Sequence, residues 1–243
     1  MRIISVCFAL ALFLSSVAAQ SAPKPWVQWS KKEVEKVLND SAWGQTQVNE
    51  RKDQPQNVEA VTQVAANRSA DRQLGREGES GERKEGLSVR YHVRFLSAKP
   101  VRAAFARMVL LAQTEPNEAL TGQLQTFVDR NFADYIVVAV GIEVSDEKIG
   151  EQFNKALGAA TTDVLKQNVY LERKDGKKLY LMEYRAPTSD GMGAKFVFQR
   201  VVDGQPFLSE TDSVKFIAQF NERMKLNTKY KLADMLYDGK LEY

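Results

Sequence analysis

The chain has very little cysteine and histidine, and this scarcity excludes the commonest metal and thiol sites. Its one cysteine, Cys7, lies in an apolar N-terminal stretch, so the remainder has no thiol for a disulfide, a zinc site or a nucleophile. Its one histidine, His92, has no second imidazole with which to share a metal ion. We therefore expect an ordinary hydrophobic core, no metal and no cofactor.

Catalytic sequence motifs are missing as well. The chain contains no G-x-S-x-G nucleophile turn, no phosphate-binding P-loop and no G-x-G-x-x-G fingerprint after a strand. This favours a non-enzymatic binding or scaffold domain of the cell envelope. The carboxylate pairs of glycoside hydrolases are assembled in space, so a carboxylate-based hydrolase acting on envelope glycans or peptides remains an alternative.

The sequence also lacks a strong excess of one charge. Lysine and arginine total 34, aspartate and glutamate total 31, and the formal net charge is +3. Because these large numbers nearly cancel, we expect no nucleic-acid partner. The length of 243 residues, with 44% hydrophobic residues, suits one large globular domain or two small ones.

Residues 1–19 have the pattern of a secretory signal peptide. Met1-Arg2 is a basic start, an apolar run extends from Ile3 to Val17, and Val17-Ala18-Ala19 supplies small residues for cleavage. We predict cleavage after Ala19 and export to the periplasm or the cell exterior. Polar residues follow at once, so no transmembrane segment is expected after cleavage.

Residues 20–49 form a tryptophan-rich segment that is predicted to contain a short helix. Ser30-Lys-Lys-Glu33 is a capping box, in which the serine oxygen and the glutamate carboxylate satisfy each other's backbone N–H groups. Trp26, Trp29 and Trp43 are the only tryptophans of the chain. They either dock this short helix on its own domain or form an exposed clamp for an envelope protein or glycan.

Residues 50–85 are polar and have no sustained apolar period, so we predict a disordered linker or a long loop. Just before it, Thr46 and Val48 are expected to add a short edge strand. Residues 86–243 are predicted to form the main folded domain.

Two stretches of this domain predict strands of different kinds. Leu87–Phe95 has apolar side chains at every odd position, which is typical of a strand buried on one face. Tyr135–Val140 is nearly all apolar and β-branched, as in a central strand covered on both faces. Tyr91 and Val138 are therefore expected in the middle of one core.

Helical spacing appears between these strands and after the second. We predict one helix that is capped by Ser97 and has Pro100 in its first turn, a second that follows Pro116, and a third that begins at Ser145. The rest reads as short strands, with Asp-Gly hairpin turns at 175–176, 203–204 and 238–239. The prediction is an α+β fold: a mostly meandering antiparallel sheet with helices packed on one face, in two layers.

One weak signal for ligand binding comes from the polar faces of two strands. The first carries Arg90, His92 and Arg94, and the second carries Lys225, Asn227, Lys229 and Lys231. If the two strands lay side by side, they would form a basic stripe for an anionic polymer or a lipid head group. The alternatives are a solvated, aggregation-blunting face and, for His92, a solvated surface residue.

Several stretches resemble a group of uncharacterised exported bacterial proteins. They are Pro25-Trp-Val-Gln-Trp-Ser30, Leu38–Thr46, Tyr170–Lys177 and Tyr237–Tyr243. The resemblance implies export from a bacterium, and it implies no activity, cofactor or catalytic residue.

Overall fold

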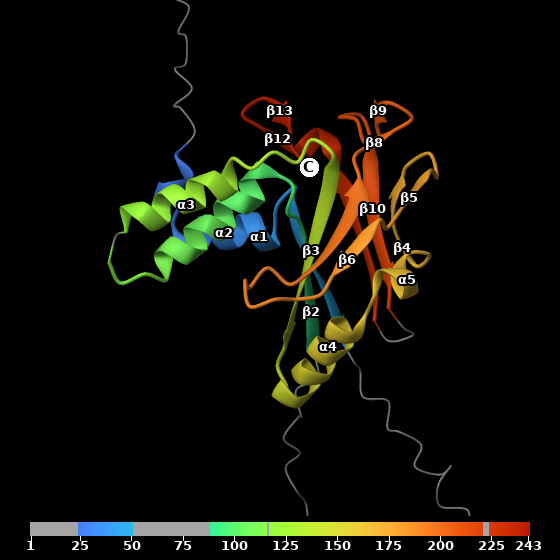
Figure 1. Cartoon of the computed structure of the whole chain (residues 1–243), viewed down its shortest axis with the longest axis horizontal. Helices are drawn as coiled ribbons and strands as arrows, with labels where there is room; N and C mark the ends of the chain where they lie inside the picture. Colours follow the sequence, from blue (N-terminus) through green and yellow to red (C-terminus); the bar gives the residue numbers. More distant parts are fainter. Residues whose placement is uncertain (1–23, 51–87, 116, 221–223) are drawn as a thin grey trace, which may run out of the picture.

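The computed structural model describes residues 24–50, 88–115, 117–220 and 224–243. The predicted signal peptide, 1–19, and nearly all of the predicted linker, 50–85, lie outside the described residues. Within them the fold is α+β, as predicted, with five α-helices in contact with antiparallel sheets (Figure 1).

The larger sheet has five strands in the order β1-β2-β3-β7-β6. Its strands are β1 (Gly44–Glu50), β2 (Ser88–Phe95), β3 (Tyr135–Val144), β7 (Ala194–Gln199) and β6 (Glu183–Arg185). The edge strand predicted around Thr46 and the central strand predicted from Tyr135 are both present.

The second sheet has four strands in the order β11-β10-β4-β5. Its strands are β11 (Lys225–Lys231), β10 (Ser213–Gln219), β4 (Val169–Arg173) and β5 (Lys178–Tyr180). The antiparallel strands are thus divided between two main sheets, where the sequence pattern suggested one. Alternation specifies which side chains are buried, but two sheets that bury one face each give the same alternation as one.

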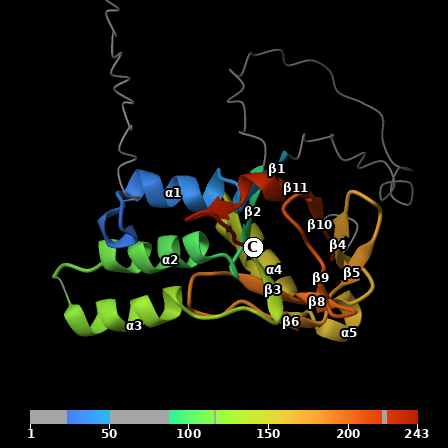
Figure 2. The same ribbon diagram turned by 90° about the horizontal axis from the view of Figure 1, so that it is seen from above.

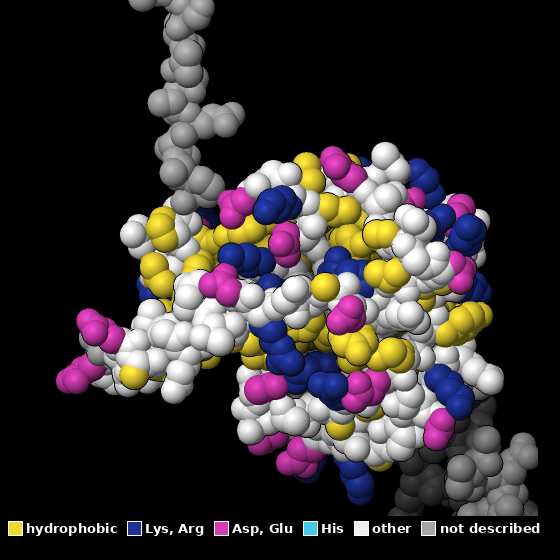
Figure 3. Space-filling model, turned by 45° about the horizontal axis from the view of Figure 1, so that its top comes forward, with side chains coloured by type: hydrophobic (Ala, Val, Ile, Leu, Met, Phe, Trp, Pro, Cys, Tyr) yellow, Lys and Arg dark blue, Asp and Glu magenta, His cyan; other side chains and the backbone are white. Residues whose placement is uncertain are grey.

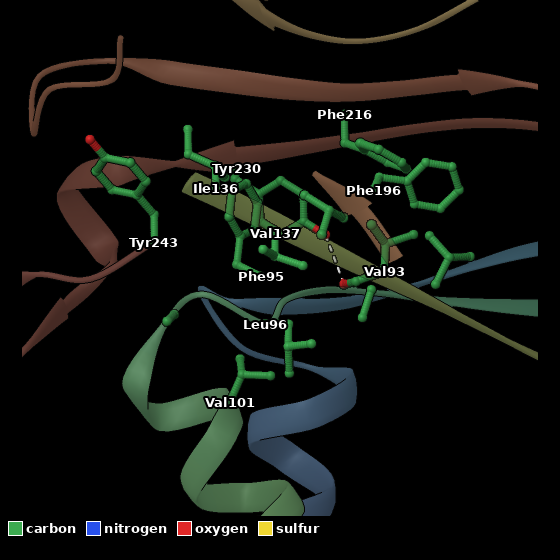
Figure 4. Close-up of a cluster of buried hydrophobic side chains, with 14 of the residues drawn as sticks. Val93, Phe95, Leu96, Val101, Ile136, Val137, Phe196, Phe216, Tyr230 and Tyr243 are labelled. Atoms are coloured by element: carbon green, nitrogen blue, oxygen red, sulfur yellow. Dashed lines mark hydrogen bonds between the residues drawn. The ribbon is translucent and has the colours of Figure 1, made fainter. Parts of the chain in front are cut away.

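The two sheets pack face to face around aromatic side chains (Figure 4). The rings of Phe95 and Tyr230 lie 4.8 Å apart, and those of Phe196 and Phe216 lie 5.4 Å apart, each pair joining the two sheets. The Tyr230 hydroxyl donates a hydrogen bond of 2.8 Å to the Val93 carbonyl across the same interface. This layer is the core of the molecule.

The residues expected in the middle of the core are there. Tyr91 is 1% exposed and Val138 is 0% exposed, and their strands β2 and β3 are direct neighbours. The prediction of a single core that includes both side chains is confirmed.

The helices lie outside the two sheets (Figures 1 and 2). A lobe to one side is formed by α1, α2 and α3, while α4 and α5 lie at other edges of the sheets. Their bounds are α1 Lys31–Asn39, α2 Lys99–Leu111, α3 Glu118–Val128, α4 Glu147–Ala159 and α5 Thr162–Leu165. Short 3-10 turns, η1 and η3, cover Trp26–Gln28 and Leu232–Asp234.

The helix starts agree with the sequence in one case and differ in another. The capping box of α1 is confirmed, because the Ser30 hydroxyl accepts from the Glu33 N–H and the Glu33 carboxylate accepts from the Ser30 N–H. At α2 the N-cap is Ala98, with no side-chain cap. The Ser97 hydroxyl instead accepts from the Val137 N–H at 3.0 Å, which fixes the start of α2 to β3.

All three Asp-Gly pairs make hairpin turns, as predicted. They connect β4 to β5, β8 (Val201–Val202) to β9 (Gln205–Pro206), and β12 (Leu236–Tyr237) to β13 (Lys240–Leu241). In the second and third, both turn residues have positive φ, with φ of 52° and 74° at Asp203 and Gly204. Such turns match the right-handed twist of the strands that they join.

The lateral edges of the two sheets are joined in two ways. On one side the chain crosses directly from β5 to β6. There the Leu181 N–H donates to the Val169 carbonyl of the four-stranded sheet, and the Met182 N–H donates to the Val197 carbonyl of the five-stranded sheet. On the other side, side-chain amides of β1 bond the backbone of β11. Gln45 donates to the Lys229 carbonyl at 2.8 Å, and Gln47 donates to Lys225 and accepts from Asn227. The amides thus protect two strand edges that would otherwise be unpaired.

The contact between the sheets predicts a specific loss of stability. Tyr230→Phe removes the hydroxyl that bonds the buried Val93 carbonyl, so the free energy of unfolding should fall by about 1–2 kcal/mol. Tyr180→Phe is the matched control, because that side chain is 51% exposed. Urea denaturation followed by circular dichroism measures both variants, and equal losses in the two would contradict this account.

Candidate anion-binding face

The structure does not bring the two predicted groups of basic residues together. Arg90, His92 and Arg94 point outward from β2 in the five-stranded sheet, whereas Lys229 and Lys231 point outward from β11 in the four-stranded sheet. Since the sheets pack through their inner faces, these side chains lie on opposite sides of the molecule. The basic stripe expected from both groups is not formed.

Arg94 has a structural position beneath α1. It is 8% exposed; its Nε donates to the Leu38 carbonyl at 2.9 Å, and its Nη2 donates to the Asn39 Oδ1 at 2.8 Å. Its guanidinium also lies 5.4 Å from the ring centre of Phe105 on α2. Burial lowers the pKa of Arg94 to about 10, which leaves it charged at neutral pH. A side chain committed in this way is not available to a ligand.

His92 is not the solvated residue that we expected. Its side chain is 14% exposed. The Nδ1 lies 3.0 Å from the Thr46 hydroxyl and the Nε2 lies 3.1 Å from the Glu143 carboxylate. Burial, and then the charge of Arg94, lower the pKa of His92, while the hydrogen bond to the Glu143 carboxylate opposes them. Glu143 also pairs with Arg90 at 3.6 Å.

Glu143, His92 and Thr46 form the series carboxylate, imidazole and hydroxyl, which in many enzymes activates a hydroxyl nucleophile. The Thr46 hydroxyl, however, also donates to the Asn39 carbonyl at 3.2 Å, so it is not dedicated to the Nδ1 of His92. With a His92 side chain only 14% exposed, the cluster also leaves little access for a substrate. The cluster links β1, β2, β3 and the end of α1, and we interpret it as structural.

The four-stranded sheet carries the stronger candidate site on its outer face. We call this the basic face, and it consists of the twelve outward positions of its strands: Lys225, Asn227, Lys229, Lys231, Ser213, Lys215, Ile217, Gln219, Tyr170, Glu172, Lys178 and Tyr180. Five lysines against one glutamate give this face a net charge of +4, more than the +3 of the whole chain. The helical lobe lies on the other side of the molecule (Figure 2).

Most lysines of the basic face have no acidic partner. Lys215 lies 3.5 Å from Glu172, but Lys225, Lys229 and Lys231 form no ion pair with any residue in the described ranges. Lys215 and Lys229 also face each other directly across the β10–β11 pair. Like charges opposite each other destabilise a sheet, so this face has an electrostatic cost that a bound anion would offset.

Cations of the five-stranded sheet's outer face are paired instead. Lys195 lies 2.7 Å from Asp190, and Arg185 lies 2.9 Å from Glu183. Figure 3, a view from the front and top of Figure 1, shows acidic and basic side chains interspersed. Among the described strand residues of the two main sheets, the lysines without an ion pair therefore lie on the basic face.

Two tyrosines lie side by side on the basic face. Tyr170 and Tyr180 are direct cross-strand partners with ring centres 5.6 Å apart. The ammonium of Lys178 lies 4.4 Å from the centre of the Tyr170 ring, and the hydrogen bond with Tyr170 raises the pKa of Lys178. Tyr180 is 51% exposed and so offers an apolar ring beside the lysines.

The tryptophans make contacts within the domain. Trp26 and Trp29 are 8% and 9% exposed. Their indole N–H groups donate to Gln125 of α3 and to the Lys24 carbonyl, respectively. Trp43 donates to the Glu242 carbonyl at 2.8 Å and packs edge-on against Tyr237. These contacts favour docking of the segment on its own domain over an exposed aromatic clamp.

Other site types receive little support. Within the described ranges, no three or more His, Cys, Asp or Glu residues are grouped to hold a metal ion. No helix in the part of the chain that was searched has the length and apolarity needed to cross a bilayer. A shallow, open depression borders α3. Polar side chains that line it form hydrogen bonds with one another, as the Gln125 amide does with the Asp129 carboxylate at 2.5 Å.

No family model, curated protein or solved structure matches the chain. The resemblance to exported bacterial proteins thus stays a prediction, and the site must be interpreted from its own geometry.

Sequence reasoning named four of the twelve members of the basic face, all of them on β11. Lys215, Lys178 and Tyr180 are among the eight that it missed, and they lie on β10 and β5. What the sequence does not show is that β10 pairs with both β11 and β4, and this pairing gathers the charges.

The His92 cluster predicts an unambiguous titration, because the chain has a single histidine. NMR of the ring C–H groups should give a pKa below the ordinary value of 6.5. The unfolded chain then binds more protons near that pH, so stability should fall as the pH drops below 6.5. Glu143→Gln removes the group that opposes this shift and should lower the pKa further.

Glu172→Gln, on the opposite side of the molecule, is the control and should leave the titration unchanged. A pKa above the ordinary value, or the same shift in both variants, would refute the cluster as described.

Proposed function

We propose that this chain is an exported, non-enzymatic binding domain of the cell envelope, and that the basic face holds an anionic ligand. The observation that carries the proposal is the excess of positive charge on that face, five lysines against one glutamate, with Lys229 directly opposite Lys215. The signal peptide that the sequence predicts at residues 1–19 supports the proposed location. An anionic polymer and a surface of lipid head groups both have the required chemistry.

The charge of the basic face favours a ligand over simple solvation. A solvated strand face is usually a mixture of signs, and a blunted edge needs only one or two lysines. Here five lysines from three of the four strands share one surface with a single glutamate. Such an arrangement gains solubility at a cost in sheet stability, whereas an anionic ligand removes that cost.

The charge arrangement predicts that acidic substitutions on β11 weaken binding without a loss of stability from Lys229→Glu. Lys229→Glu places a carboxylate opposite Lys215, so the free energy of unfolding should stay level or rise by about 0.5 kcal/mol. Combined with Lys231→Glu, it should weaken binding to polygalacturonate, a soluble anionic polysaccharide, by at least about tenfold at low salt. Binding by the unmodified chain should weaken as salt is added.

The matched control is Lys148→Glu with Lys155→Glu, which makes the same change in net charge on exposed positions of α4. Isothermal titration calorimetry and urea denaturation measure the two properties. Salt-independent binding, or equal weakening by the control pair, would exclude the basic face as the binding site.

A further inference from the structure

We infer that the ligand of the basic face is the surface of an anionic lipid bilayer, against which this sheet lies flat. The inference rests on the proposed function and narrows its ligand from any anion to a planar membrane surface. Three features support it: the shared outward direction of the side chains, the choice of lysine as the cation and the apolar side chains at one edge.

The basic face presents its side chains on one side of the sheet. Its outward positions alternate with buried ones along every strand, so the lysine stems leave the sheet on the same side. Strands β11 and β10 present them in register, with Ser213 opposite Lys231, Lys215 opposite Lys229 and Gln219 opposite Lys225. The charges are therefore spread over the breadth of a sheet face, and such an array complements a charged surface.

Lysine suits this role better than arginine. Its ammonium is a compact, hydrated charge on a flexible stem, which adapts to mobile head groups rather than fixing one anion in a forked geometry. Each lysine near an anionic bilayer surface strengthens binding by about fivefold. The arginines of this fold serve elsewhere, in buried contacts such as that of Arg94 with Leu38.

Apolar side chains border the lysines at the β5 edge. Tyr180 is 51% exposed within the face, and Met182 follows two residues later at 44%. Val164 is 66% exposed in α5, which is fixed to the neighbouring strand β6 by the bond from the Tyr184 N–H to the Thr162 hydroxyl. Tyrosine is enriched at membrane–water interfaces. Together these residues could insert at head-group depth while the lysines remain in the aqueous layer.

The experiment uses the chain from Gln20 onward, which contains every described element, and two kinds of vesicle. One is pure phosphatidylcholine, and the other contains phosphatidylglycerol as the anionic lipid. In co-sedimentation the chain should bind the anionic vesicles and not the neutral ones. Replacing Lys225, Lys229 and Lys231 singly by glutamine should weaken this binding about fivefold each, while Lys148→Gln should have no effect.

Insertion at the apolar edge is tested with a fluorescent reporter. Tyr180→Trp should show a blue shift of emission with anionic vesicles and no shift with soluble polygalacturonate. Met108→Trp, at a position 41% exposed on α2, is the matched control and should show no shift with either. The urea midpoints of both variants should equal that of the unmodified chain.

The outcomes separate this inference from the proposed function. Binding to polygalacturonate without binding to anionic vesicles would overturn the membrane inference and leave the anion-binding function standing. Equal binding to neutral and anionic vesicles would also overturn it, because charge would then play no part. Failure to bind either probe would overturn both.

Discussion

The packing of two sheets through aromatic side chains is the contact on which the rest of the structure depends. With no cysteine after Cys7, nothing covalent can hold the sheets together. Phe196 lies against Tyr184 at 5.2 Å and against Phe216 at 5.4 Å, so one ring joins an edge strand of the first sheet to the centre of the second. Because both inner faces are used in this layer, any function must lie on an outer face or an edge.

Buried arginines complete the outer side of the five-stranded sheet. A guanidinium has five donors in a fixed plane, so one side chain can bond carbonyls from separate segments. Arg102 donates to the carbonyls of Val128 and Ser97, and Arg200 donates to that of Tyr135 and lies 4.1 Å from the Tyr243 ring. Together with Arg94 they hold the helical lobe and distant chain segments to the sheet, which commits most of this side to structure.

The sequence predicted what depends on neighbours along the chain and missed what depends on distant contacts. Alternation through Tyr91, the capping box at Ser30 and the Asp-Gly turns are local, and all were found. The division into two sheets and the burial of Arg94 beneath α1 are long-range. Gln45 and Gln47 are the clearest example. They are polar residues at inward positions of β1, and their side-chain amides form hydrogen bonds with the backbone of β11. Only the pairing of β10 assembled the candidate site.

The two outer faces therefore have different physical roles. On the five-stranded sheet, cations such as Lys195 are paired or buried, and the helices cover part of the surface. On the four-stranded sheet, Lys225, Lys229 and Lys231 form no ion pair within the described ranges, although the chain as a whole is nearly neutral at +3. A sheet can tolerate opposed lysines only if its stability comes from elsewhere, here from the aromatic layer beneath. That layer is thus what allows the basic face to keep a charge that serves binding rather than folding.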